Sequence, residues 1–372
     1  MNKKVTSITF LMFLILLPIL SNAQLTTAPD GGNKKASVSE QIGISKISIE
    51  YSRPGVKGRE GKIWGTQVAH YGLVNLGFGS AEASPWRAGA NENTVITFGS
   101  NVLVEGKTLA SGSYGLHMIL GETETTVVFS KNYTAWGSFF YLPSDDALRV
   151  TVKNETLTES VEWLTYSFIR QTANSAVIAL DWEKRRIPFK VEVDVNAVQI
   201  ASFKKELQGP LGFDYRGFVQ AAQYCLQNNY ELEQALEWAD IAVSAVYIGD
   251  KNFTTLSTKA QVLAKLGRMD ESTMVMKEAL PLGTITEIHQ YGRQLLMQKK
   301  VKQAFDVFEM NYKNNPKAFM TNFGLARAYS AKGDFKKAEK YMKNAVKLAP
   351  DKLSKAQSEA MLQLLKDSKD IN

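Results

Sequence analysis

Cysteine, histidine and long apolar runs are all scarce in this sequence of 372 residues. The single cysteine, Cys225, excludes an internal disulfide, and we expect it to be a small core residue of a helix. The three histidines, His70, His117 and His289, include no pair at the i, i+4 spacing of a zinc-binding helix. No metal or other cofactor is therefore expected, and stability must come from packing alone.

No apolar run reaches the length of about 20 residues that a bilayer span needs. The longest, residues 10–20, follows Lys3 and Lys4 and precedes the small residues 21–23, which is the arrangement of a cleaved secretory signal. Residues 1–23 are therefore predicted to be a signal peptide. The mature chain is expected to be a soluble periplasmic or extracellular protein without a membrane span, and an uncleaved N-terminal membrane helix is the alternative.

Charge is unevenly distributed along the chain. The formal net charge of +7 becomes +5 once the two lysines of the signal are removed, and residues 24–213 hold 19 basic and 19 acidic side chains. The excess therefore lies in residues 214–372, and five lysines recur along one helix from Lys336 to Lys347. Acidic residues are interleaved with them, which favours a solvated face. An exported protein of this kind is not expected to bind nucleic acid.

One helix-pair pattern recurs four times in residues 214–350. The equivalent small residues are Ala235, Ser272, Ala304 and Ala338. Their steps of 37, 32 and 34 residues are typical of tetratricopeptide repeats, in which each unit is a pair of antiparallel helices. In the last copy Gly333 permits the turn between the helices, and Pro350 ends the second helix. The pattern predicts an all-α solenoid, and residues 351–372 are expected to supply a capping helix and tail.

A repeat array of this kind binds partners and needs no catalytic group. We expect the first helix of each pair to line its concave side, so the polar residues of those helices are candidate contacts. These candidates are Gln223, Gln261, Gln290, Arg293, Asn322 and Arg327. The two arginines would suit an acidic peptide or a terminal carboxylate, and an ordinary solvated face is the alternative for each residue.

Alternating apolar residues replace the helical period in the N-terminal half. Strands are predicted at residues 42–51, 94–98, 102–105, 114–120, 125–129, 148–153, 163–170, 176–182 and 189–195. Closely spaced strands without helices between them indicate an antiparallel sandwich or barrel. The predicted class is α+β multidomain, with a β-sandwich-like domain at 38–196 ahead of the solenoid. Residues 24–37 are expected to be a disordered leader, and 197–213 a linker helix with a break.

Several short strings of the β domain are distinctive. They are Tyr51-Ser52-Arg53-Pro54, Lys57-Gly58-Arg59, Trp86-Arg87-Ala88-Gly89-Ala90-Asn91-Glu92 and Gly112-Ser113-Tyr114-Gly115-Leu116. In these strings the chain resembles the secreted bacterial proteins grouped as domain of unknown function 2911, over residues 38–195. The resemblance implies export and a β fold, and some members similarly carry helical repeats behind it. It implies no established reaction, so no catalytic residue is carried over.

Residues 86–92 combine chemically different groups just before a predicted strand. Trp86, Arg87, Asn91 and Glu92 bring a flat apolar ring, a forked cation, an amide and a carboxylate together. Such a group could hold a sugar, a peptide carboxylate or a polar metabolite. The structural alternative is a tryptophan that plugs the end of the sandwich beside an arginine paired with the glutamate.

Arg53 and His117 are further ligand candidates of the β domain. Alternation along residues 114–120 places His117 opposite Leu116 and Met118, on the face that is expected to be wetter. A structural or solvated histidine is the simpler interpretation. A site that combines His70, His117 and Glu92 across the fold is the alternative.

The predicted function is non-catalytic binding by an exported protein. The array would hold a protein or peptide partner, and the β domain would give a second contact or a site for a small ligand or glycan. The rival hypothesis is an envelope hydrolase or carbohydrate-active protein that uses residues 86–92. Catalysis requires Glu92 and a histidine to share a pocket, whereas a purely structural role requires Arg87 and Glu92 to pair.

Overall fold

The computed structural model describes residues 32–372, and the chain divides into two compact units at Val193 and Asp194. The predicted signal peptide, and the leader as far as residue 31, lie outside the described residues. Within residues 32–372, no helix combines the length and the apolar character that crossing a membrane requires. The predicted fold class, an antiparallel β domain followed by an array of helices, is confirmed.

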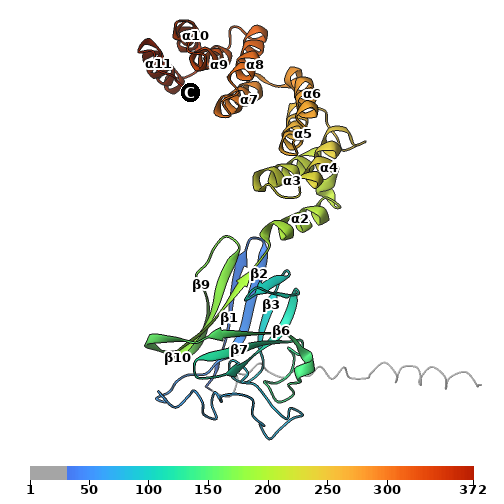
Figure 1. The fold of residues 1–372 in the computed structure, drawn as a ribbon, viewed down its shortest axis with the longest axis vertical. Coiled ribbons are helices and arrows are strands. Elements are labelled where there is room, and N and C mark those ends of the chain that lie inside the picture. Colours follow the sequence, from blue (N-terminus) through green and yellow to red (C-terminus); the bar gives the residue numbers. More distant parts are fainter. Residues whose placement is uncertain (1–31) are drawn as a thin grey trace, which may run out of the picture. The chain divides into compact units, whose positions relative to one another are not determined.

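Two antiparallel sheets build the first unit (Figure 1). The strands are β1 (Lys34–Ile42), β2 (Ser45–Arg53), β3 (Thr94–Phe98), β4 (Val102–Val104), β5 (Lys107–Leu109), β6 (Gly112–Leu120), β7 (Glu124–Ser130), β8 (Asp146–Lys153), β9 (Glu155–Ile169) and β10 (Ser175–Glu192). The larger sheet has the order β1-β2-β3-β6-β7-β8, and the smaller has the order β5-β4-β10-β9. Because β1 begins at Lys34, the expectation of a disordered leader is wrong for residues 34–37.

Aromatic side chains from both sheets form the core of this unit. Tyr51 of β2 meets Tyr166 of β9 edge to face with ring centroids 4.9 Å apart, and Phe129 of β7 meets Phe189 of β10 at 5.8 Å. Alternate residues of each strand point inward, as the buried positions of β3 illustrate. The inner faces of the two sheets therefore pack against each other as in a sandwich.

Two strand predictions differ from the structure for local backbone reasons. The strand expected at 42–51 is part of a hairpin, because the chain turns at Gly43 with φ of +60° and β1 then pairs with β2. The two strands expected at 176–182 and 189–195 form one strand, β10. Glu183, with φ of +51°, lies at an irregularity that interrupts the alternation without ending the strand.

The second unit contains helices in sequence from α2 to α11. They are α2 (Val195–Glu206), α3 (Tyr215–Asn228), α4 (Leu232–Ser244), α5 (Phe253–Lys265), α6 (Met269–Ala279), α7 (Ile285–Met297), α8 (Val301–Asn314), α9 (Phe319–Ala331), α10 (Phe335–Leu348) and α11 (Lys352–Lys366). Helices α3 to α10 form four consecutive antiparallel pairs, each joined by a short turn (Figure 1). Helix α11 packs on α10, where a solenoid needs a cap.

Glycines allow the third and fourth helix pairs to approach closely. The ring of Phe308 in α8 is fully buried against Gly292 of α7 and Gly324 of α9. A Cβ atom on Gly292 would lie 2.6 Å from the ring, and one on Gly324 would overlap it too. The absence of side chains at these two positions is what leaves room for the aromatic ring between the helices.

Helix α2 belongs to the packed array, although the sequence suggested a linker. Phe203 of α2 contacts the ring of Tyr224 in α3 at 5.4 Å and that of Trp238 in α4 at 6.4 Å. Asp194 caps the helix by accepting a hydrogen bond of 2.9 Å from the backbone N–H of Ala197. The predicted helix is therefore present as α2, followed by the predicted break at Gly209-Pro210, and it packs on the first repeat pair.

Cys225 lies in α3 and is fully buried in the core between α2, α3 and α4. Burial raises the pKa of its thiol to about 11, with a smaller contribution from Glu231. The thiol is therefore protonated at neutral pH and packs as a small apolar side chain.

Candidate functional site

The segment that carries the β-domain site enters the sheet beside β6. Trp86 exchanges two backbone hydrogen bonds with Met118, of 2.9 and 2.8 Å, and so occupies the position that a neighbouring strand would hold. The chain then leaves the sheet and returns to it at Thr94, the first residue of β3. Ala88 and Asn91 both have positive φ, +50° and +59°, so residues 87–93 form a tight loop of strained backbone.

Three indole rings lie beneath this loop. Trp86 stacks on Trp182 of β10 with an interplanar angle of 6° and centroids 6.1 Å apart. Trp64 meets both rings edge on, at 5.8 and 5.7 Å. The cluster joins the loop to the smaller sheet, and its neighbours fix the orientation of Trp86.

Arg87 points toward the loop that it belongs to. Its Nη1 donates a 2.8 Å hydrogen bond to the backbone oxygen of Asn91, and its guanidinium lies 4.9 Å from the ring centroid of Phe139. Gly137 lies against the guanidinium, since a Cβ atom there would be 2.7 Å from Cζ. Burial lowers the pKa of Arg87 from its usual value, which shows that the cation is partly removed from water.

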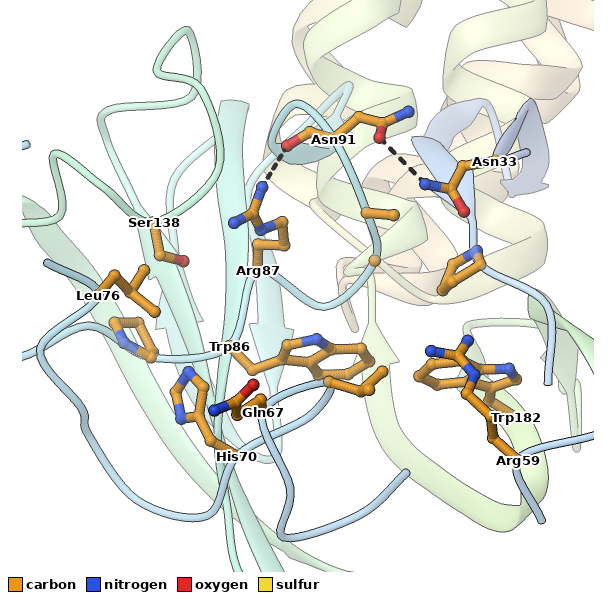
Figure 2. A pocket seen from close by; sticks show the side chains of 15 residues that line it. Asn33, Arg59, Gln67, His70, Leu76, Trp86, Arg87, Asn91, Ser138 and Trp182 are labelled. Carbon is orange, nitrogen blue, oxygen red and sulfur yellow. Dashed lines mark hydrogen bonds between the residues drawn. The ribbon is translucent and has the colours of Figure 1, made fainter. Parts of the chain in front are cut away.

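A cavity of about 280 Å³ opens between the loop and the indole cluster (Figure 2). Its lining residues are Asn33, Pro54, Arg59, Gln67, Val68, His70, Leu76, Pro85, Trp86, Arg87, Gly89, Ala90, Asn91, Ser138 and Trp182. Two of them are arginines, and none is Asp or Glu. The structure therefore brings the predicted residues Trp86, Arg87 and Asn91 together in one lining.

His70 faces this cavity from the segment between β2 and β3 (Figure 2). Its Nδ1 is buried and has no hydrogen-bond partner among the described residues. Burial lowers the pKa of His70. A hydrogen bond to the backbone of Gly72 raises this pKa in part, and the positive charge of Arg87 lowers it further. The imidazole is therefore neutral at pH 7 and leaves a polar atom unpaired beside a cation.

Glu92 and Arg53, two further candidates, lie outside this lining. Glu92 pairs with Lys35 and accepts a hydrogen bond from Ser52, both at 3.1 Å. Burial raises the pKa of Glu92, but its own backbone N–H, Lys35 and Ser52 together lower it below the usual value. Arg53 donates to the backbone oxygen of Leu164 at 2.8 Å and so ties β2 to β9. The predicted pairing of Arg87 with Glu92 is not formed among the described residues.

His117 is buried, so the expectation that it lies on a wet face is wrong. Its side chain is 2% exposed, because residues 131–142 cover this side of the sheet. Its Nδ1 lies 2.9 Å from Ser138 Oγ, and its ring packs against Tyr141. Burial, together with the charge of Arg87, lowers the pKa of His117 to about 4. In residues 32–372 no three His, Cys, Asp or Glu side chains form a metal site, so His70, His117 and Glu92 do not converge.

The buried His117 predicts a pH dependence of stability. His117 binds a proton near pH 6.5 in the unfolded state and only near pH 4 in the folded state. Between these two pH values, protonation of His117 therefore favours unfolding. The free energy of unfolding of the first unit should fall by up to ~1.4 kcal/mol per pH unit as the pH is lowered through it. Urea titrations followed by tryptophan fluorescence would measure the slope. His117→Gln should reduce it, leaving the part that His70 contributes, and an unchanged slope would contradict the assignment.

The helical array has its own candidate surface. Gln261 of α5 and Gln290 of α7, both predicted groove residues, line the same hollow of about 210 Å³. Its remaining lining residues are Phe253, Thr254, Ser257, Thr286, Glu287, Tyr291 and Gln294. Gln223 of α3 is exposed and donates a long 3.4 Å hydrogen bond to Thr258 of α5, while Arg293 is exposed on α7.

A second hollow of about 310 Å³ adjoins the first between helices α5 to α8. The two share Gln261, Tyr291 and Gln294, so they adjoin at these side chains, and we refer to them together as the groove. The second hollow is mainly apolar, and Met269, Met276, Leu280 and Val307 are among its lining residues. The groove therefore combines a row of amide groups with an adjoining apolar recess.

Asn322 and Arg327 of α9 are not free groove contacts. Asn322 is buried, and its Nδ2 donates to the backbone oxygens of Pro316 and Ala318, both at 2.9 Å. The prediction of Asn322 as a groove residue is therefore wrong, since its amide holds the turn that begins α9. Arg327 of α9 donates a 2.9 Å hydrogen bond to the backbone oxygen of Ile371, so the C-terminal residues occupy its guanidinium.

Residues 370–372 lie against α9. Ser330 Oγ donates to Asp370 at 2.6 Å, and the side chain of Asn372 donates to the backbone oxygen of Arg327 at 3.1 Å. Ile371 is buried in the cluster formed by α9, α10 and α11. Part of the surface that the two arginines were expected to offer a partner is thus covered by the chain itself.

Known families match most of the first unit and one helix pair of the second. Residues 33–191 match the family model described as protein of unknown function (DUF2911), and residues 320–352 match the tetratricopeptide repeat model. The chain joins a DUF2911 domain to tetratricopeptide repeats. The resemblance inferred from the sequence is thereby confirmed, and the cavity is a feature of the DUF2911 domain.

Solved structures with tetratricopeptide repeats are similar to part of the chain. MamA, residues 41 to the end, from Desulfovibrio magneticus RS-1 is 23% identical, with a TM-score of 0.29 over 43% of this chain and 88% of that one. YrrB, described as a TPR protein with an unusual peptide-binding site, is 17% identical, with a TM-score of 0.28 over 45% and 84%. No curated protein matches the sequence.

Proposed function

We propose that this chain is an exported, non-catalytic binding protein whose repeat array holds an extended segment of a protein partner. The observation that carries the proposal is the groove on α5 to α8, where Gln261, Gln290 and Gln294 lie beside an apolar recess. The match to the tetratricopeptide repeat model supports a binding role for the array.

The chemistry of the groove favours a peptide main chain. A glutamine amide both donates and accepts hydrogen bonds, so it can satisfy the N–H and C=O groups of an extended segment. The adjoining recess, with Met269 and Met276, can receive an apolar side chain of the same segment, because methionine adapts its shape to different partners. An extended peptide with one apolar side chain fits the groove, because its main chain can contact the glutamines while the side chain enters the recess.

The hydrolase hypothesis finds less support in the geometry. Glycosidases use two carboxylates that flank the scissile bond, and the cavity lining of the DUF2911 domain contains none. Glu92 is engaged by Lys35 and Ser52, away from the lining. We therefore assign the DUF2911 domain a second contact or a small-ligand site in place of catalysis.

Export remains part of the proposal because of residues 1–23. Their basic start, apolar run and small residues before Gln24 are the features that signal peptidase recognises. N-terminal sequencing of the protein recovered from the periplasm or medium should begin at Gln24. Recovery of the chain from the cytoplasm with Met1 retained would contradict export.

Site-specific photo-cross-linking of the full chain in cells tests the groove. A photoreactive residue at Gln290 or Gln294 should give a discrete cross-linked species, because a bound segment would lie against these side chains. The same residue at Lys302, which is exposed on α8 and lines neither hollow, is the matched control. Equal cross-linking at Lys302 and Gln290, or none at either glutamine, would refute the groove assignment.

A further inference from the structure

We propose that the cavity of the DUF2911 domain is a binding site for a small organic carboxylate, which Arg87 holds through its guanidinium. The inference rests on the small-ligand role proposed for this domain and names the class of ligand, whereas it is independent of the array, because the site lies in the other unit and uses none of the groove residues. The inference depends on the charge of the lining, on hydrogen-bonding atoms left unused and on the shape of the cavity.

The charge of the lining is uncompensated. Buried charges in proteins are normally paired, and Arg87 is partly removed from water. Yet no carboxylate of residues 32–372 lies within ion-pair distance of Arg87 or Arg59, although other arginines of the same domain, such as Arg170 and Arg186, have such partners. Two cations therefore face one cavity that contains no acid, which attracts an anion.

Arg87 also has free hydrogen-bonding capacity. Nη1 donates to Asn91, and within the described part of the chain neither Nε nor Nη2 makes a hydrogen bond. The Nε and Nη2 edge of a guanidinium matches the two oxygens of a carboxylate in a planar, paired arrangement. Arg59 is more committed, since Nε and Nη2 donate to the backbone oxygens of Val56 and Gly55 at 3.0 and 2.7 Å. Arg59 thus contributes charge, and Arg87 contributes recognition.

The remaining lining is mainly polar, with a smaller apolar part that can contact the carbon body of an organic acid. Trp86, Val68, Pro85 and Leu76 present apolar surface, which suits a carbon body attached to the acid. His70 and Gln67 lie beside Trp86 and offer neutral polar groups (Figure 2). The volume of about 280 Å³ is near the lower end of the range for ligand pockets, about 300–1,000 Å³, so the ligand is small.

The backbone supports a binding role for the loop. Ala88 and Asn91 hold left-handed conformations, which are unfavourable for alanine and which asparagine tolerates. The surrounding bonds maintain them: the oxygen of Ala88 accepts from Thr94 and from Tyr166, at 3.0 and 2.9 Å. Such strain places Arg87 at the cavity before any ligand arrives, so little ordering is required on binding.

Isothermal titration of the mature chain, residues 24–372, tests the proposal with defined probes. Sodium benzoate and sodium hexanoate are the carboxylates, benzamide and hexanamide are their uncharged counterparts, and sodium phosphate represents an inorganic anion. We expect at least one carboxylate to bind saturably and its amide to bind about tenfold more weakly, a difference of about 1.4 kcal/mol. Amide binding of equal strength, tighter binding of phosphate, or no binding of either carboxylate at millimolar concentration would overturn the proposal.

Variants connect the binding to the cavity. Arg87→Gln should weaken carboxylate binding at least about tenfold, because the paired hydrogen bonds and the charge are both lost. Gln67→Glu adds an anion at an exposed position of the lining, so it should also weaken binding without disturbing the core. Arg170→Gln removes an exposed arginine that does not line the cavity, and it should bind as the wild type does. Unchanged binding by both Arg87→Gln and Gln67→Glu would refute the site.

The array provides an internal reference for these variants. Cross-linking at Gln290 should be unaffected by Arg87→Gln, since the two residues belong to different units. Loss of carboxylate binding with intact cross-linking would thus report on the cavity alone. Failure of the groove experiment would leave the carboxylate titration interpretable, because neither measurement depends on the other.

Discussion

Replacement of Phe308 by alanine should lower the free energy of unfolding of the helical unit by about 3–5 kcal/mol. The ring is fully buried between α7 and α9, where Gly292 and Gly324 lie against it. Its removal leaves a cavity that the neighbouring helices cannot fill, because two positions around it have no side chain to move. Urea unfolding followed by circular dichroism at 222 nm, a helical signal, would measure the loss.

Phe213→Ala is the matched control for this prediction. That phenylalanine belongs to the same unit but is 76% exposed, so its removal should change the free energy of unfolding by less than about 0.5 kcal/mol. A similar loss in both variants would show that the packing around Phe308 is not what stabilises the array. Because the chain has two units, each transition must be fitted separately.

Trp182→Ala should destabilise the DUF2911 domain by about 3–5 kcal/mol. Trp182 is fully buried, stacks on Trp86 and meets Trp64 edge on, so its loss removes the contact that joins the loop to β10. The shift in tryptophan emission on urea unfolding would report the change, since five of the six tryptophans belong to this unit.

The control for Trp182 is Trp136→Ala. Trp136 lies in the same unit and is 55% exposed, so its removal takes away an indole without opening the core. We expect a change of less than about 1 kcal/mol. If Trp182→Ala were as mild as this control, the indole cluster would not be the structural support of the cavity.

The architecture could be predicted because it depends on local periodicity. Small side chains are needed where two helices approach closely, and this requirement repeats in every pair. They therefore recur at steps of 37, 32 and 34 residues, about the length of one repeat. The strand predictions are wrong where the backbone conformation of a single residue decides whether a strand ends or continues. Gly43 turned one expected strand into a hairpin, and the irregularity at Glu183 joined two expected strands into one.

The site was predictable only in part, because the sequence shows which groups are near each other along the chain and not across it. Trp86, Arg87 and Asn91 line the cavity, yet Trp182 and Asn33 reach it from distant strands and segments. Arg87 and Glu92, which the structural alternative pairs, have other partners: Glu92 contacts Lys35 and Ser52, and Arg87 contacts the backbone of Asn91. Alternation alone predicts an accessible His117, because it carries no information about residues 131–142, which cover that face.

The buried state of Cys225 has a consequence for the exported protein that we propose, which would meet oxidising conditions. A thiol with a pKa near 11 and no exposure presents almost no thiolate to disulfide-forming enzymes or to a second molecule. Mixed disulfides and covalent dimers can then form only from molecules in which α2 has separated from α3 and α4. The rate at which a thiol reagent modifies the native chain therefore measures how often the first repeat opens, with no label added.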